Sequence, residues 1–296
     1  MRRGAACGIR GALWLSTMAC SSATTGGALP VDAGAEVTGP AACTAKSRCT
    51  GTTSGGGECV TTLDVTLVDP GGKAIAGVPV FACGTNLCTE PTATDATGHA
   101  ALAPCVTIAN PALKVFDDPT WAPFAAGLLG PGPSFVIPKV TVAPLPAQGS
   151  LLANGSNASA GVTLAVPGAV KFDLEHAMAS SQAFRAAAVT PAWFAGTALD
   201  PGPPGLQVAW ALAPLNTTLS PPGKLTVPNT AAWPAGAQVD VFLDGTDTTT
   251  ATPVAPWGAW GPIGSGHVSA DGLSVSTDDG SGNGLPEVGL VGLRLH

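Results

Sequence analysis

Glycine and proline interrupt this chain so often that long regular elements have little room to form. Its 296 residues include 39 Gly and 28 Pro, and both residue types weaken the interior of a helix or a central strand. Nevertheless, 45% of the residues are apolar and the mean hydropathy is positive, which excludes disorder along the whole chain. We therefore expect short strands joined by tight turns, in a chain long enough for two modest domains.

Charged residues are scarce and mostly acidic. The chain has 12 Lys and Arg against 19 Asp and Glu, which gives a formal net charge of −7 at pH 7. A nucleic-acid partner requires clustered basic side chains that displace counterions from the phosphates. The composition therefore excludes nucleic-acid binding and agrees with solubility outside the cell.

The N-terminus has the pattern of an export signal. Arg2 and Arg3 precede an apolar stretch at residues 11–19, and small residues follow it. A basic start, a short apolar run and small residues at its end are typical of a secretory signal peptide, and this run is too short to span a bilayer. We predict a signal peptide at residues 1–19 and export of the remaining chain.

The end of this signal carries a cysteine. The sequence Thr17-Met18-Ala19-Cys20 resembles the lipobox of bacterial lipoproteins. The resemblance implies that Cys20 is acylated, becomes the mature N-terminus and anchors the protein in a membrane, with sorting to the outer membrane or cell surface. The alternative is ordinary cleavage near Ala19, which would leave a periplasmic or secreted protein.

A cysteine-rich segment follows the signal. Residues 20–57 are rich in Ser, Thr, Gly and Ala, so we predict a flexible tether. The candidates for disulfide bonds are Cys43, Cys49, Cys59, Cys83, Cys88 and Cys105. Their spacing is not that of zinc ligands, and in an exported chain six cysteines imply up to three disulfides. Cys83–Cys88 is the one disulfide pair that we predict, because a four-residue loop at a strand end can bring both Cβ atoms to bridging distance.

The first β region is predicted at residues 58–145. Leu63, Val65 and Leu67 alternate with less apolar residues, and turn residues follow at positions 69–72. The segments VTLVDPGGKAIAGVPV (residues 65–80) and TDATG (residues 94–98) resemble the carboxypeptidase regulatory-like domain, a seven-stranded sandwich akin to transthyretin. The resemblance implies an accessory or adhesive module, without catalytic residues.

The second β region is predicted at residues 146–296. A turn-rich linker at residues 154–159 precedes short strands separated by Gly, Pro, Asn and Asp. Residues 176–188 favour either a helix or a loop that leads into a strand. The segments SPPGKLTVPNTAAWPAGAQVDVFLDG (residues 220–245) and SGHVSADGLSVSTDDG (residues 265–280) resemble a C-terminal β domain of surface lipoproteins in high-GC Gram-negative bacteria, an uncharacterised family. The predicted fold is all-β, with two antiparallel, immunoglobulin-like β-sandwich domains.

Catalytic and metal-binding motifs are absent from the sequence. It contains no nucleophile elbow, zinc-protease motif, phosphate loop or dinucleotide fingerprint. His99 and His267 lie beside hairpin turns, where we expect solvent-facing strand residues. The acidic pair Asp173 and Glu175 and the loop at residues 278–284 lack the ligand number that calcium requires, so we expect a solvated strand face and a turn. No catalytic residue, metal or cofactor is predicted.

Tryptophans in Pro- and Gly-rich connections are the remaining candidates for function. Trp193, Trp233, Trp257 and Trp260 could each cap the end of a sandwich core, since each buries a large apolar area. Alternatively, the pair Trp257 and Trp260 could stack on sugar rings. The predicted function is that of a non-enzymatic surface lipoprotein with an adhesive or structural role. The alternative is a polysaccharide-binding module, so the expected partners are a membrane, through the lipid anchor, and a surface glycan or protein.

Overall fold

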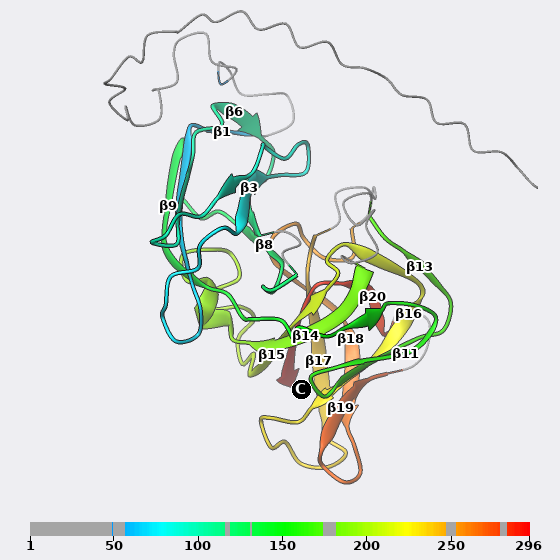
Figure 1. Cartoon of the computed structure of the whole chain (residues 1–296). Coiled ribbons are helices and arrows are strands. Elements are labelled where there is room, and N and C mark those ends of the chain that lie inside the picture. The colour runs from blue at the N-terminus through cyan, green and yellow to red at the C-terminus, as the bar shows by residue number, and fades with distance from the viewer. Residues whose placement is uncertain are drawn as a thin grey trace, which may run out of the picture. The chain divides into compact units, whose positions relative to one another are not determined.

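The computed structural model describes Cys49 and residues 57–115, 119–130, 132–173, 182–246, 253–278 and 283–296 (Figure 1). These residues all belong to one compact unit, which runs from Pro40 to His296. The predicted signal peptide, Cys20 and Cys43 lie outside the described residues. Regular structure in the described ranges is β-strand apart from one 3-10 turn, η3 (Pro191–Phe194), so the all-β prediction is confirmed.

The first β region forms two main sheets and a separate strand pair. The three-stranded sheet has the order β5-β2-β9 and consists of β2 (Thr62–Val68), β5 (His99–Leu102) and β9 (Ser134–Thr141). The four-stranded sheet has the order β4-β3-β7-β8 and consists of β3 (Pro79–Cys83), β4 (Thr92–Ala93), β7 (Ala112–Val115) and β8 (Phe124–Gly127). The separate pair consists of β1 (Glu58–Val60) and β6 (Val106–Ile108).

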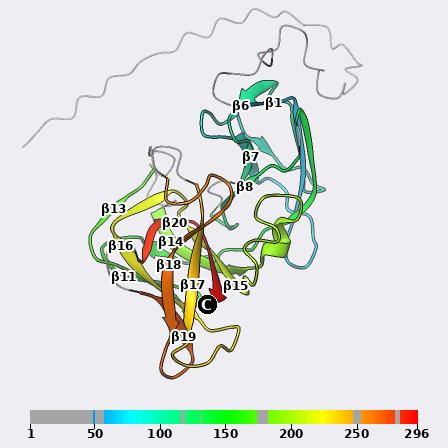
Figure 2. The ribbon, with the colours of Figure 1, turned by 180° about the vertical axis from the view of Figure 1, so that it is seen from behind.

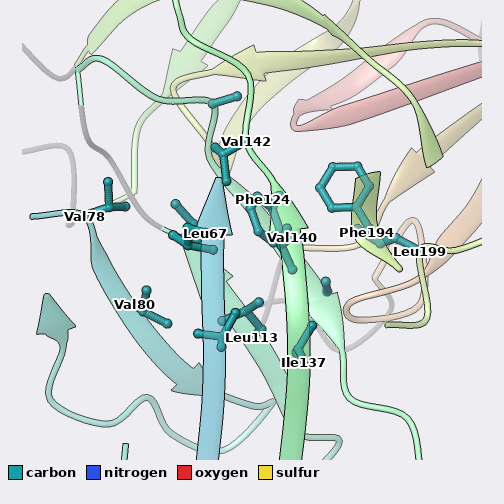
Figure 3. Packing of buried hydrophobic residues seen from close by; sticks show 14 of the residues in the cluster. Leu67, Val78, Val80, Leu113, Phe124, Ile137, Val140, Val142, Phe194 and Leu199 are labelled. Atoms are coloured by element: carbon teal, nitrogen blue, oxygen red, sulfur yellow. The ribbon is translucent and has the colours of Figure 1, made fainter. Parts of the chain in front are cut away.

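The core of this region follows the alternation in the sequence. Leu63, Val65 and Leu67 are all buried on one face of β2, because successive side chains of a strand point to opposite faces. Figure 3 shows Leu67 in the same cluster as Leu113 from the four-stranded sheet. The sheets therefore enclose one shared apolar layer.

Strand β9 differs from the antiparallel prediction, because it pairs with β2 in parallel. It is an edge strand, as its internal proline indicates. The register shifts between Val65 and Leu67 of β2, opposite Ile137 and Val140 of β9. Pro138, which has no N–H to donate, lies within this irregularity, so the missing ladder bond falls where pairing is already interrupted.

The second β region forms one large antiparallel sheet. Its strand order is β10-β14-β15-β21-β17-β18-β19-β16-β12-β11, and β13 and β20 also pair with β16. The strands are β10 (Ser150–Leu151), β11 (Gly155–Ser159), β12 (Val162–Val166), β13 (Ala169–Lys171), β14 (Ala183–Val189), β15 (Val208–Ala213), β16 (Thr217–Pro228), β17 (Gln238–Asp244), β18 (Trp260–Val268), β19 (Ser274–Thr277), β20 (Leu285–Val288) and β21 (Leu290–Leu295). Figure 2 shows β17, β18 and β19 as neighbours.

This sheet curls until strands near its two ends meet. The backbone N–H of Ala186 in β14 donates to Oγ of Ser159 in β11, at 3.1 Å. A continuous apolar cluster, which includes the buried Trp210 and Trp233, lies inside the curl. The region thus builds its core from a single curved sheet, which is a barrel-like form of the expected sandwich.

Two local expectations are settled in this region. The predicted linker at residues 154–159 is wrong, because most of it forms β11. The side chain of Asn157 is buried and binds backbone groups of Ala153 and Leu164, so an asparagine that suggests a turn instead joins this hairpin. Residues 183–189 form β14, which agrees with the loop-and-strand alternative; residues 174–181 lie outside the described residues.

The two β regions pack directly on each other through β8. The Gly127 N–H donates to the carbonyl of Gly258 at 2.7 Å, and its carbonyl accepts from the Ala198 N–H at 2.8 Å. The rings of Phe124 and Phe194 meet edge to face, with centroids 5.0 Å apart. The predicted boundary at residues 145 and 146 lies between β9 and β10, and one apolar cluster contains residues from both sides of it.

Candidate functional site

Polar side chains gather in two rows, one across four adjacent strands and the other across the same four and a fifth. The first row follows the register of β21, β17, β18 and β19 and consists of Arg294, Asp240, Ser265 and Asp278. The second row continues onto β16 and consists of His296, Gln238, His267, Ser276 and Thr226. Residues opposite each other on neighbouring strands project to the same side of a sheet. We call these nine residues the polar face.

The other side of the same strands is apolar. Val239 and Val241, which alternate with Gln238 and Asp240 along β17, are buried in the cluster inside the curl. The polar face is therefore the outer surface of the sheet, and the curvature that encloses the core also holds these side chains at defined positions.

Asp240 is the centre of one hydrogen-bonded group. Its two carboxylate oxygens are 2.8 Å from Nε of Arg294 and 2.8 Å from Nδ1 of His296. The hydrogen bond with His296 and the one from Arg294 hold the pKa of Asp240 below its usual value. An ionised carboxylate can only accept, so the proton of this contact belongs to Nδ1 of His296.

Asp278 is the centre of a second group. It accepts from Oγ of Ser265 at 2.6 Å and lies 2.7 Å from Nδ1 of His267. Burial raises the pKa of Asp278, but the hydrogen bonds with Ser265 and His267 outweigh burial and leave the pKa below its usual value. The same argument places the proton on Nδ1 of His267, which leaves Nε2 directed away from the carboxylate.

The order of these groups does not suit nucleophilic catalysis. In a catalytic triad the imidazole lies between the hydroxyl and the carboxylate, so that it can take the hydroxyl proton. Here Asp278 lies between Ser265 and His267, and the Ser265 hydroxyl donates to the carboxylate. The arrangement therefore orients side chains and does not activate Ser265. Across the described ranges, no three or more His, Cys, Asp or Glu side chains are grouped so as to hold a metal ion.

Trp260 lies at the border of the polar face. Its indole Nε1 donates to the carbonyl of Leu199 at 3.1 Å, and the side chain is half-buried. A Cβ atom on Gly292 would lie 3.2 Å from Cζ3 of Trp260, so a residue without a side chain lets the indole lie on β21. Beside it, the guanidinium of Arg294 lies 5.1 Å from the centroid of the Phe242 ring, a cation–π contact.

The other tryptophans from the sequence occupy different environments. Trp257 is half-buried, and its Nε1 is buried without a hydrogen-bond partner. Trp193 is also half-buried and packs against the cluster that includes Phe194. Trp233 is buried and donates from Nε1 to Oε1 of Gln207 at 2.8 Å. Of the two residues predicted to contact a glycan, Trp260 lies beside the polar face, and sugar stacking by either stays a prediction.

A buried pair of carboxyl groups was missed by sequence reasoning. Asp244 precedes a glycine in the sequence, which suggests a turn, but its side chain is fully buried at the end of β17. Oδ2 accepts only a long bond of 3.4 Å from the Ala125 N–H, and Oδ1 has no hydrogen-bond partner. Burial, and secondarily the charge of Glu287, raise the pKa of Asp244 well above its usual value. Glu287 is itself buried and accepts from Oγ1 of Thr246.

The acidic residues considered as calcium ligands in the sequence lie in different parts of the structure. Oδ2 of Asp173 accepts from Nδ2 of Asn216 at 3.4 Å, whereas Glu175 and His176 lie outside the described residues. In the glycine-rich loop, Asp278 belongs to the polar face, and residues 279–282 lie outside the described residues. Asp278 was thus missed as a partner of His267, because the two are joined only by strand pairing.

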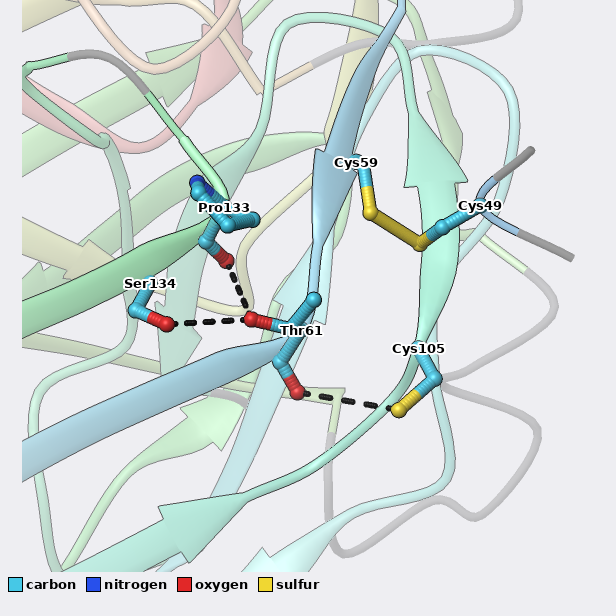
Figure 4. Close-up of a disulfide and its surroundings, with 6 residues drawn as sticks. All are labelled: Cys49, Cys59, Thr61, Cys105, Pro133 and Ser134. Atoms are coloured by element: carbon cyan, nitrogen blue, oxygen red, sulfur yellow. Dashed lines mark hydrogen bonds between the residues drawn. A yellow bond between two sulfur atoms is a disulfide. The ribbon is translucent and has the colours of Figure 1, made fainter. Parts of the chain in front are cut away.

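Disulfides close the first β region. The predicted pair Cys83–Cys88 is present, and a second bond joins Cys49 to Cys59 in β1 (Figure 4). Cys105 is also disulfide-bonded, and its Sγ lies 4.0 Å from the carbonyl of Thr61. Next to the Cys83–Cys88 loop, a groove of about 480 Å³ opens between residues 87–92 on one side and residues 102–104 with Val106 on the other. Its single charged lining residue is Glu90.

A scan against protein-family models finds no match for this chain, and a search of the curated proteins finds no similar chain. Within the described residues, no helix has the length and apolar character needed to cross a membrane.

Proposed function

We propose that this protein is an exported, non-enzymatic lipoprotein of the outer membrane or cell surface, with an adhesive or structural role. The observation that carries the proposal is the pair of disulfides, Cys49–Cys59 and Cys83–Cys88. Disulfides persist in oxidising compartments outside the cytoplasm. This chemistry agrees with the export signal predicted at residues 1–19, and the proposed acylation of Cys20 rests on the lipobox resemblance.

The architecture supports a binding or structural role over catalysis. The two β regions are joined by backbone hydrogen bonds through Gly127 and by a common apolar cluster, which favours a rigid body at the end of a tether. The polar side chains around Asp240 and Asp278 donate to these carboxylates, an arrangement that orients them without activating a nucleophile. The seven strands of the two facing sheets also suit the proposed likeness to a carboxypeptidase regulatory-like domain.

Labelled palmitate tests the anchor directly. We expect incorporation into the wild-type chain in a Gram-negative host and none into Cys20→Ala, with the wild type in the membrane fraction and the variant released. Cys43→Ala is the matched control and should still be labelled. An unlabelled wild-type protein found free in the medium would overturn the anchored assignment.

A second candidate function is polysaccharide binding. It is favoured by the position of Trp260, whose half-buried indole lies against Gly292, two residues before Arg294 on β21. Aromatic rings beside polar groups are a common way to bind sugars, because the ring covers the apolar face of the sugar. Quenching of tryptophan fluorescence by cell-wall and capsular polysaccharides tests this function, and Trp260→Phe and Trp257→Phe would show which indole contributes.

A further inference from the structure

The polar face concentrates titratable groups in a chain that has few of them. It holds two of the four His of the chain together with Asp240, Asp278 and Arg294. Lys224 borders it, since its charge contributes to lowering the pKa of Asp278. With neutral imidazoles, two positive and two negative groups balance, so the face offers little net charge to an ionic partner.

The charged groups of the face are engaged within the face, whereas one amide and two imidazole nitrogens are open to a partner. Asp240 and Asp278 each receive two hydrogen bonds from within the face, and Arg294 also donates to the carbonyl of Pro204. The amide of Gln238 is exposed, and so are the rings of His267 and His296, whose Nε2 atoms carry no hydrogen bond within the described chain. What the face presents to a partner is a set of neutral donors and acceptors.

The two imidazoles and two of the hydroxyls are held in place before any partner arrives. Each imidazole is fixed at Nδ1 by a carboxylate, and the hydroxyls of Thr226 and Ser276 bind each other at 2.8 Å. Binding through the two imidazoles would therefore cost little side-chain entropy. The second row crosses five strands at about 4.8 Å each, so it extends over roughly 19 Å. That length suits an extended chain rather than a single small molecule.

We infer that the polar face binds an uncharged, hydroxyl-rich polymer, a neutral polysaccharide, through Gln238 and through Nε2 of His267 and His296. Each sugar hydroxyl both donates and accepts, which matches a neutral imidazole acceptor beside an amide that can do both. This inference rests on the polysaccharide-binding candidate above and moves the main contacts from the tryptophan loops to the sheet.

Calorimetric titration of the full chain tests the inference. The chain carries Cys20→Ala so that it stays unacylated, and the probes are cellohexaose, laminarihexaose, maltohexaose, chitohexaose and mannohexaose, with polygalacturonate fragments as the acidic comparison. We expect one neutral oligosaccharide to bind. Gln238→Ala and His267→Ala should each weaken it roughly 3- to 10-fold, the cost of one neutral hydrogen bond.

The matched control is His99→Ala. His99 also lies beside an aspartate, with Nε2 3.5 Å from Asp64, but on the three-stranded sheet. The His99→Ala variant should bind the probe as the wild type does, and unchanged unfolding midpoints would show that all variants are folded. Nitrogen-15 NMR adds an independent readout, because the imidazole signals of His267 and His296 should shift on binding and that of His99 should not.

Three results would overturn the inference. The first is that no neutral probe binds, and the second is that only the acidic fragments bind. The third is that neither Gln238→Ala nor His267→Ala, tested separately, weakens binding of a neutral probe. If the last result is accompanied by loss of binding in Trp257→Phe, polysaccharide binding stands and only its placement on the polar face is wrong.

Discussion

Replacing Asp244 with Asn should make the protein more stable at neutral pH and remove a pH dependence. The Asp244 side chain is fully buried, accepts one bond of 3.4 Å and leaves Oδ1 without a partner. Ionising it in the folded protein is opposed by burial and by the charge of Glu287, so its pKa is raised well above the usual value. Asn has nearly the same shape and no proton to lose, and its amide N–H can point toward Glu287.

The sign and slope follow from proton binding. Above about pH 4 the unfolded Asp244 is ionised while the folded one keeps its proton, so the folded state binds one more proton. The stabilisation from this group is fully present below the unfolded pKa and is lost as pH rises toward the folded pKa. The free energy of unfolding should therefore fall by about 1.4 kcal/mol for each pH unit in that window. Asp244→Asn lacks this slope.

Guanidinium unfolding at about pH 4.5, 5.5 and 6.5, with disulfides intact, measures the effect. As pH rises, the free energy of unfolding of Asp244→Asn should increase relative to that of the wild type by up to about 1.4 kcal/mol per pH unit. Asp271→Asn is the control, because the hydrogen bond from Ser269 lowers the pKa of Asp271 and its effect is confined to lower pH. A difference for Asp244→Asn that stays constant over the three pH values would refute the reasoning.

Three further predictions concern packing, the polar face and the disulfides. Gly245→Ala should cost about 3 kcal/mol in thermal or chemical unfolding, because a Cβ there would lie 2.2 Å from the carbonyl oxygen of Pro256; an unchanged midpoint would contradict the close approach. Asp278→Asn should lower the free energy of unfolding at pH 7 by about 1 kcal/mol, and this difference should shrink in acid, since the stabilisation from a lowered pKa is fully present above the unfolded pKa and is lost as pH falls through the folded pKa. Non-reducing peptide mapping should recover the two disulfides in the structure and link Cys105 to Cys43, the cysteine that remains once residues 1–19 are removed and Cys20 is acylated; six free thiols would contradict export.

Strand content could be predicted because it depends on neighbours in the chain. The alternation at Leu63, Val65 and Leu67 lies within one strand, and the pair Cys83–Cys88 closes a loop of four residues. The parallel pairing of β9 with β2 could not be predicted in this way, since it joins residues about 70 positions apart. The β11 strand was missed because Asn and Gly at residues 154–157 favour turns in isolation, whereas burial of Asn157 is a tertiary contact.

The candidate site shows the same division. His267 was expected as a solvent-facing strand residue, and it is one; its partner Asp278 was assigned to a glycine-rich turn. Neither residue alone suggests a binding surface. The surface arises when four strands align in register and bring Arg294, Asp240 and Ser265 into a row with Asp278.

The sequence by itself determined that this chain is an all-β protein, because turn residues and period-two alternation are local patterns. The tertiary structure decided which polar residues are exposed together and which are buried. Asp240 and Asp244 lie four positions apart on one strand and point to the same side, yet one is a partly exposed carboxylate beside Arg294 and the other is buried against β8. This difference in burial depends on which segments pack over each end of β17, and the local sequence pattern does not predict that packing.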